Sequence, residues 1–257
     1  MAADRALAER ARALVLLAAG AALLAGCGGG GAPTLKVSAA ASLKTAFTPY
    51  GASFSPARAA FSFAGSDELA AQIRQGVKPD VFASANTRLP AQLYAAGKLE
   101  RPVDFAANRL VLAVPARGGK VHSLAAAAQP GVKVVVGSST VPIGAYTRQV
   151  LARLGPGTAR GILANVRSEE PDVSSVVAKL TQGAADAGFV YVTDVRAAGG
   201  RLRAIGLPVR AQPRVVYAAA VVRGTGHPRQ ARAFVRGLLS GPGRRALLAA
   251  GFEPPPR

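Results

Sequence analysis

The chain of 257 residues is long enough for one large domain or for two lobes of about 100 residues each. Half of its residues are hydrophobic and 18% are charged, which excludes a wholly disordered chain. One cysteine and two histidines exclude an intrachain disulfide framework and leave few ligands for a catalytic metal. The net charge of +19 favours anionic partners, but the arginines are mostly spaced singly and aromatic residues make up only 5% of the chain. We therefore expect no nucleic-acid partner.

The first 26 residues are typical of a secretory signal peptide. Three arginines precede an apolar run, residues 13–25, that is too short to span a bilayer comfortably. The run ends in Leu24-Ala25-Gly26-Cys27, which resembles the lipobox of bacterial lipoproteins. We expect a signal peptide at 1–26, then a lipidated Cys27 in a glycine-rich tether at 27–33, and an exported body with a net charge of +18. An ordinary signal peptide with an incidental cysteine is the alternative.

After the tether, short strand patterns alternate with amphipathic helix patterns, which indicates an α/β fold with parallel sheets covered by helices. The predicted strands are 35–39, 59–64, 79–84, 109–115, 132–137, 187–191 and 215–222. The predicted helices are 42–50, 66–75, 87–96, 145–154, 173–182, 228–239 and 243–250. The pattern restarts after 115, which predicts two lobes of mixed, mainly parallel sheets: 34–112 with 219–257, and 113–218. The strands at 109–115 and 215–222 are the expected crossovers, and two crossovers restrain the lobes to a hinge motion.

The predicted strands lead into turns rich in small residues and hydroxyls, at 40–43, 64–67 and 137–144. Ligands of open α/β sheets bind outside the carboxyl ends of the strands. Each turn opens a helix, whose first N–H groups and positive dipole end hold an anion without a charged side chain. A serine before a helix is by itself more often an N-cap than a ligand contact. Their joint placement is what predicts an oxyanion site in a cleft between the lobes.

A series of segments in register resembles the periplasmic molybdate-binding proteins of ABC importers. The segments are 37–43, 63–73, 79–85, 140–146, 170–173, 187–191 and 248–252, and the resemblance extends over essentially the whole chain after the tether. It implies a class II, two-lobed solute-binding fold that closes on a tetrahedral oxyanion and delivers it to a membrane permease with its ATPase. From the lipobox we expect the protein to be anchored to the outer face of the cell membrane through a lipid on Cys27, and we expect a monomer.

The resemblance also implies the ligand contacts. Ser42 and Ser66 would donate from the first lobe through hydroxyl and backbone N–H, Ile143 and Val173 from the second through backbone N–H, and Tyr191 through its phenol. No cofactor and no metal cation are implied, because molybdenum enters only as the oxyanion. Hydrogen bonds to a charged acceptor are strengthened, so neutral donors suffice for a dianion.

Two departures from the family's pattern bear on ligand choice. Ile143 stands where the family usually has a small residue, and Asp67 and Glu68 follow Ser66, where we expect them to face solvent. A site of donors alone favours molybdate, tungstate or sulfate, whereas hydrogen phosphate carries a proton that needs an acceptor. Asp67 is the candidate acceptor, so sulfate and phosphate remain alternatives to molybdate and tungstate.

An enzyme is the competing class. A serine hydrolase would need a nucleophile, for which the candidates are Ser42, Ser138 and Ser139, and a base, for which they are His122 and His227. None of these serines lies in a G-x-S-x-G motif between a strand and a helix, which is the usual setting of such a nucleophile. A transcriptional effector would need a helix-turn-helix where this chain has an export signal. We expect no catalytic residues and a binding protein that works by hinge closure.

Overall fold

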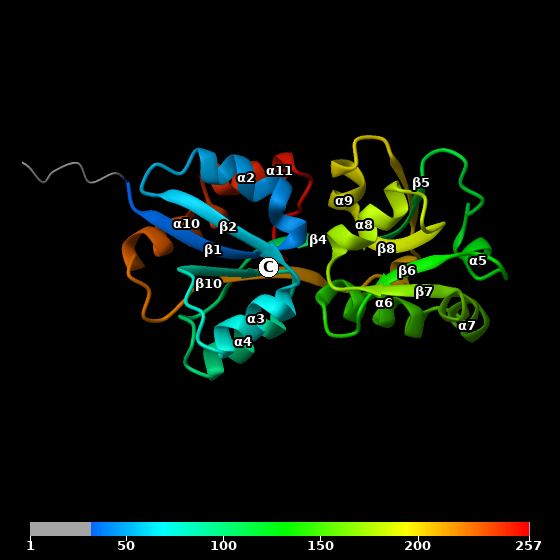
Figure 1. The fold of residues 1–257 in the computed structure, drawn as a ribbon, viewed down its shortest axis with the longest axis horizontal. Coiled ribbons are helices and arrows are strands. Elements are labelled where there is room, and N and C mark those ends of the chain that lie inside the picture. Colours follow the sequence, from blue (N-terminus) through cyan, green and yellow to red (C-terminus); the bar gives the residue numbers. More distant parts are fainter. Residues whose placement is uncertain (1–31, 257) are drawn as a thin grey trace, which may run out of the picture. The chain divides into compact units, whose positions relative to one another are not determined.

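The computed structural model describes residues 32–256, so the expected signal peptide and Cys27 lie outside the described residues. Residues from Thr34 onward form one compact unit built on two five-stranded sheets (Figure 1). Each sheet has helices packed on its faces, which makes each a lobe of an α/β fold. The expected two-lobed architecture with mixed sheets is confirmed.

The first lobe holds a sheet with the strand order β2-β1-β3-β10-β4. Its strands are β1 (Thr34–Ala40), β2 (Arg58–Ala64), β3 (Val81–Ser84), β4 (Val103–Asn108) and β10 (Val215–Val221). Its helices are η1 (Ala41–Leu43), α2 (Lys44–Ala52), α3 (Ser66–Arg74), α4 (Arg88–Ala95), α10 (Pro228–Leu239) and α11 (Pro242–Ala249). In Figure 1, α2 and α11 lie over one face of the sheet and α3 and α4 over the other.

The second lobe repeats this plan with the order β7-β6-β8-β5-β9. Its strands are β5 (Leu110–Pro115), β6 (Val134–Gly137), β7 (Val166–Glu170), β8 (Ala187–Tyr191) and β9 (Leu202–Gly206). Its helices are α5 (Leu124–Ala127), α6 (Pro142–Arg153), α7 (Pro156–Ala164), α8 (Val173–Thr181), α9 (Val192–Ala197) and η2 (Val209–Ala211). In both sheets the first three strands of the order run parallel, and the remaining two pairings are antiparallel. Each sheet therefore has as many antiparallel as parallel strand pairs, so parallel pairs do not predominate. The antiparallel pairs are those made by β10 and β5, the strands through which the chain enters a sheet from the other lobe.

The chain changes sheet twice. It leaves the first sheet at Arg109, between β4 and β5, and returns through residues 207–214, between β9 and β10. The expected lobe limits at 112 and 219 fall inside β5 and β10, each of which belongs over its whole length to one sheet. At the first crossover Asn108 Nδ2 donates to Thr193 Oγ1 at 2.9 Å, a buried hydrogen bond between β4 and α9.

An aromatic cluster holds the helices of the first lobe on its sheet. Phe47 and Tyr50 of α2 pack against Phe234 of α10, with ring centroids 5.6 and 4.5 Å apart. The Tyr50 hydroxyl donates to the Phe234 carbonyl oxygen at 2.9 Å, so the buried polar atom of this ring is satisfied. Burying each such ring stabilises the fold by about 2–3 kcal/mol.

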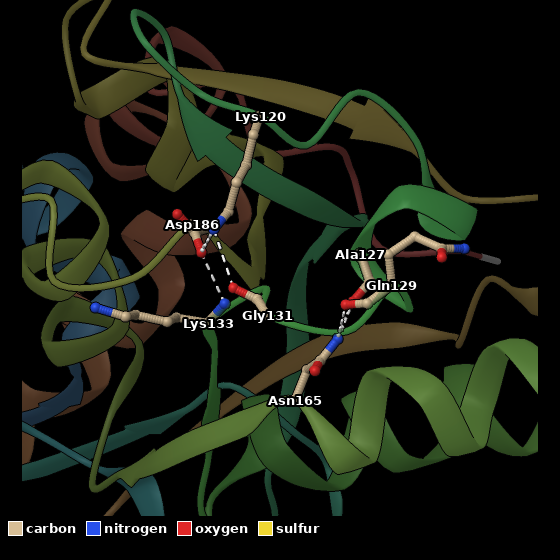
Figure 2. A network of polar contacts seen from close by, with 7 residues as sticks. All are labelled: Lys120, Ala127, Gln129, Gly131, Lys133, Asn165 and Asp186. Atoms are coloured by element: carbon tan, nitrogen blue, oxygen red, sulfur yellow. Dashed lines mark hydrogen bonds and ion pairs between the residues drawn. The ribbon is translucent and has the colours of Figure 1, made fainter.

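Several elements of the second lobe were not predicted: α5, α7, β7, α9 and β9, besides β4 of the first lobe. Figure 2 shows polar contacts that hold the loop around α5 against the sheet. The Asn165 amide donates to the carbonyl oxygens of Ala127 and Gln129 at 2.9 and 2.7 Å, and Asp186 accepts from the Lys133 backbone N–H at 2.7 Å. Such side-chain to backbone contacts join distant segments, so a local hydrophobic period does not reveal them.

Within residues 32–256, no helix combines the length and the apolar character that crossing a membrane requires.

Candidate functional site

A small pocket lies where six strand ends of the two sheets face each other. It is lined by Ala40, Ala41, Ser42, Ala64, Gly65, Ser66, Ala85, Val141, Pro142, Ile143, Asp172, Val173 and Tyr191. All five residues expected at the site are among them, at or just after β1, β2, β6, β7 and β8. The volume open to the centre of a water-sized sphere is about 20 Å³. One water needs roughly 10–15 Å³ on this measure, so the pocket has the size of a small ion rather than of a sugar or peptide.

The first lobe supplies two buried serine hydroxyls. Ser66 is the first residue of α3, and its Oγ accepts a hydrogen bond from the Ala85 backbone N–H at 3.1 Å. Because a backbone N–H can only donate, the hydroxyl proton of Ser66 stays available to a ligand. Ser42 lies in η1, which runs directly into α2, and its Oγ is 3.0 Å from the hydroxyl of Tyr217.

The second lobe supplies main-chain donors at the starts of two helices. Pro142 opens α6, whose first turn has no side-chain cap, so Ile143 carries the first available N–H of that helix. Asp172 caps α8 by accepting from the Ser175 N–H at 3.0 Å, which leaves the Val173 N–H uncapped. Both helix starts direct their positive dipole ends at the pocket.

Tyr191 adds a phenol whose hydroxyl has no hydrogen-bond partner. The residue ends β8, is 1% exposed, and its backbone N–H is held by Asp194 Oδ2 at 2.9 Å. Burial raises the pKa of the phenol well above its usual value, so the hydroxyl keeps its proton. A buried unpartnered hydroxyl costs free energy, and one that lines a pocket of donors is satisfied when an acceptor binds there.

No lysine, arginine or histidine is among the residues that line the pocket, although the chain carries a net charge of +19. Its one ionisable carboxylate, Asp172, is engaged as the cap of α8. The residues present therefore fit an anion held by hydrogen bonds and helix ends. In the part of the chain that the structure describes, no group of three or more His, Cys, Asp or Glu side chains could hold a metal ion.

Gly65, two residues before Asp67, lies against the second lobe. A Cβ on Gly65 would stand 2.5 Å from the Pro171 carbonyl oxygen of the second lobe and 2.9 Å from Asp67 Oδ1. Glu68 is exposed as expected, but the expectation that Asp67 faces solvent is wrong for one atom, because its Oδ1 is buried and has no partner. The approach of the Pro171 carbonyl oxygen to Gly65, two residues before Asp67, has no sign in the sequence pattern.

Tyr217 is a buried residue beside the site that the sequence reasoning missed. It lies in β10, is fully buried, contacts Ser42 through its hydroxyl, and packs edge-on against the Tyr191 ring with centroids 5.9 Å apart. A tyrosine inside the apolar run 215–222 was the available signal, since a buried phenol needs a partner. Ser138 and Thr140 of the hydroxyl-rich turn, by contrast, do not line the pocket, and their side-chain hydroxyls form a hydrogen bond with each other.

Two of the serines considered as nucleophiles pair with hydroxyl groups rather than with a histidine. Ser42 pairs with Tyr217, and Ser138 pairs with Thr140. His227 Nδ1 lies 3.3 Å from Asp80 Oδ1, and His122 Nδ1 lies 3.4 Å from an Arg203 nitrogen. Neither histidine thus forms a hydrogen bond with Ser42 or Ser138, the contact that a nucleophile and its base need.

The two lobes and the small donor-lined pocket between their strand ends define a solute-binding protein. A family profile described as "Bacterial extracellular solute-binding protein" matches residues 35–253, and the chain belongs to this family. The relatives found are solute-binding proteins rather than enzymes.

Individual relatives narrow the comparison. The molybdate-binding protein ModA of Mycobacterium tuberculosis is 40% identical over 232 residues, which cover 88% of this chain and 86% of the relative. The molybdate-binding protein ModA of Haemophilus influenzae is 27% identical, over 75% of this chain and 78% of the relative. The structure of the periplasmic molybdate-binding protein of Azotobacter vinelandii shares the fold with a TM-score of 0.75 at 23% identity, covering 86% of this chain and all of that one. These matches confirm the family resemblance stated from the sequence.

Proposed function

We propose that this protein captures molybdate, and tungstate with it, in the pocket between its lobes and delivers the oxyanion to an ABC transporter permease. The observation that carries the proposal is a pocket of ion size whose polar lining is made of neutral donors. Ser42, Ser66 and Tyr191 provide hydroxyls, and the starts of α6 and α8 provide N–H groups. The similarity to molybdate-binding relatives supports the same ligand.

The proposed mechanism is hinge closure. An oxyanion bound to the serines of the first lobe presents free oxygen atoms to Ile143, Val173 and Tyr191 of the second. Those added contacts exist only when the lobes meet, so the ligand stabilises the closed form, which the permease then recognises. The two short crossovers, at Arg109 and at 207–214, restrict the motion to a hinge.

Hydrogen phosphate is the second candidate ligand, because Asp67 offers an acceptor. Its Oδ1 is buried without a partner next to Gly65, which lines the pocket. Asp67 itself is not among the lining residues, and a carboxylate repels a dianion, so the geometry favours molybdate. Sulfate satisfies the same donors as molybdate and is separated from it by size alone.

Calorimetric titration of the purified protein with molybdate, tungstate, sulfate and phosphate at pH 8 tests the ligand. We expect one molecule of molybdate or tungstate to bind per chain, and at least tenfold weaker binding of sulfate and phosphate. Phosphate binding that is tighter than molybdate binding and is lost in Asp67→Ala, which removes the acceptor, would support the second candidate instead. Absence of binding by all four anions would contradict both.

We also propose that Cys27 is lipidated and anchors the exported protein to the outer face of the membrane, where it acts as a monomer. The lipobox-like sequence before Cys27 and the extracellular character of the family support this proposal. Mass spectrometry of the protein purified from membranes should show an acylated N-terminal Cys27 and loss of residues 1–26. The Cys27→Ser variant should leave the membrane fraction, whereas retention of the variant there would contradict the anchor.

A further inference from the structure

In both serines of the pocket, the Oγ atom lies within hydrogen-bond distance of a protein N–H or O–H group. Ser66 Oγ accepts from the Ala85 N–H at 3.1 Å, a donor that cannot reverse. Ser42 Oγ lies 3.0 Å from the Tyr217 hydroxyl, and either hydroxyl can donate in that pair. The direction of this second hydrogen bond decides whether the Ser42 proton is free to be donated to a ligand in the pocket.

The surroundings of Tyr217 favour donation toward Ser42. Its side chain is fully buried in β10, and burial together with the charge of Asp194 raises the pKa of its phenol well above the usual value. The hydroxyl therefore always carries a proton, and a buried proton without an acceptor is costly. When Ser42 turns its own proton to an anion in the pocket, its oxygen accepts the proton of Tyr217, and both groups are satisfied.

We propose that Tyr217 is a positioning residue that fixes Ser42 as a donor and thereby makes the pocket reject oxyanions that carry a proton. This inference rests on the proposed function. Tyr217 does for Ser42 what the Ala85 N–H does for Ser66, so both serines face the ligand as donors. If a protonated ligand donated to Ser42 while Tyr217 also donates to it, the Ser42 proton would lose the anion as its acceptor, and turning that proton to Tyr217 would displace the Tyr217 proton from Ser42. That penalty corresponds to a discrimination on the order of tenfold or more.

The test is a double-mutant cycle on Tyr217→Phe and Ser42→Ala, with molybdate and hydrogen phosphate titrated at pH 8. Phenylalanine fills the space of the ring and removes only the hydroxyl. Tyr50→Phe is the matched control, since Tyr50 is also a buried first-lobe tyrosine whose hydroxyl makes one hydrogen bond, to the Phe234 carbonyl oxygen. Thermal unfolding of each variant without ligand checks that it folds.

In Tyr217→Phe we expect about threefold to tenfold weaker molybdate binding and a molybdate to phosphate affinity ratio about tenfold lower than in the wild type. In the Ser42→Ala background, Tyr217→Phe should change neither value by more than about twofold, because the group that it positions is gone. Tyr50→Phe should leave both affinities unchanged. Should Tyr217→Phe not fold, Ser42→Ala alone must still lower the ratio.

The outcomes separate this inference from the function on which it rests. A wild-type protein that binds neither anion contradicts the proposed function itself. If the wild type binds molybdate and Tyr217→Phe has the same molybdate affinity and the same molybdate to phosphate affinity ratio, the proposed function stands but the role of Tyr217 is overturned. If Tyr217→Phe weakens molybdate binding as much in the Ser42→Ala background as in the wild type, the role of Tyr217 is also overturned, since Tyr217 would then act through the fold.

Discussion

The two lobes share one strand order but contribute to the pocket in different ways. The first lobe presents the serine hydroxyls of η1 and α3, of which Ser66 accepts from the Ala85 N–H and Ser42 pairs with the Tyr217 hydroxyl. The second presents backbone N–H groups at the starts of α6 and α8, and the unpartnered phenol of Tyr191. Side-chain donors can be removed one at a time by substitution, whereas main-chain donors are lost only when the backbone moves. The second half of the pocket therefore depends on packing, and the first depends on residue identity.

The largest effect should follow from moving that backbone. A Cβ on Gly144, in the first turn of α6, would stand 1.8 Å from the Ser138 carbonyl oxygen and 2.3 Å from that of Gly137. Gly144→Ala should lower the free energy of unfolding by about 3 kcal/mol or more and abolish molybdate binding, because the start of α6 must shift. Urea unfolding and calorimetry measure the two effects.

Gly157→Ala is the control for Gly144→Ala. Gly157 lies in the first turn of α7 in the same lobe, and a Cβ there meets nothing within 4 Å. Alanine should raise stability by up to about 1 kcal/mol and leave binding unchanged. If Gly144→Ala and Gly157→Ala had the same stability and the same molybdate affinity, the claim that the second-lobe donors depend on backbone packing would be contradicted.

The second effect concerns a carboxylate of the second lobe. The pKa of Asp194 is raised from its usual value near 4 to about 7, because burial raises it strongly, the hydrogen bond from the Tyr191 N–H lowers it and the charge of Asp172 raises it. The folded state thus holds a proton that the unfolded chain releases near pH 4, so stability should fall as the pH rises from about 4 to 7. Asp194→Asn keeps an acceptor for the Tyr191 N–H but does not titrate, so its stability should not fall in this way. Between pH 5 and pH 8 the free energy of unfolding of the wild type should drop by about 2 kcal/mol more than that of the variant.

Urea unfolding at pH 5, 6, 7 and 8 checks the sign of this effect. Glu68→Gln, an exposed first-lobe carboxylate, should give a curve parallel to that of the wild type. A curve for Asp194→Asn that also runs parallel to the wild type would show that Asp194 is ionised throughout this range.

Tyr191→Phe should change stability and binding in opposite directions. Removal of a buried hydroxyl without a partner should stabilise the unliganded protein by about 1 kcal/mol. The same change deletes a hydrogen bond to a charged ligand, so molybdate affinity should fall about tenfold to hundredfold. Thermal unfolding without ligand and calorimetry with it separate the two, and a loss of stability in Tyr191→Phe would mean that its hydroxyl has a protein partner.

The smallest effects should come from a pair of substitutions on the two halves of the pocket. Ser66→Ala removes a first-lobe donor and should weaken molybdate binding about tenfold. Ile143→Val keeps the second-lobe N–H and should leave affinity within about twofold, at a cost of about 1 kcal/mol in stability for the buried methyl group. Comparable affinity losses in both variants would remove the distinction between side-chain and main-chain donors.

The sequence predicted the strands that carry the pocket because their periodicity and turns are local signals. Residues 35–39, 59–64 and 187–191 all fall within observed strands, and their ends bring Ser42, Ser66 and Tyr191 to one place. Contacts made by tertiary packing were not predictable in this way. The pairing of Ser42 with Tyr217 joins residues 175 positions apart, and Gly65 lies against the Pro171 carbonyl oxygen of the opposite lobe.

The most direct test of the account is a crystal structure of the protein with molybdate, with molybdenum located by its anomalous scattering. The account predicts one strong peak in the pocket, with the oxyanion accepting hydrogen bonds from Ser42, Ser66, Tyr191 and the N–H groups of Ile143 and Val173. A peak held by arginine side chains on the surface, or no peak between the lobes, would contradict it.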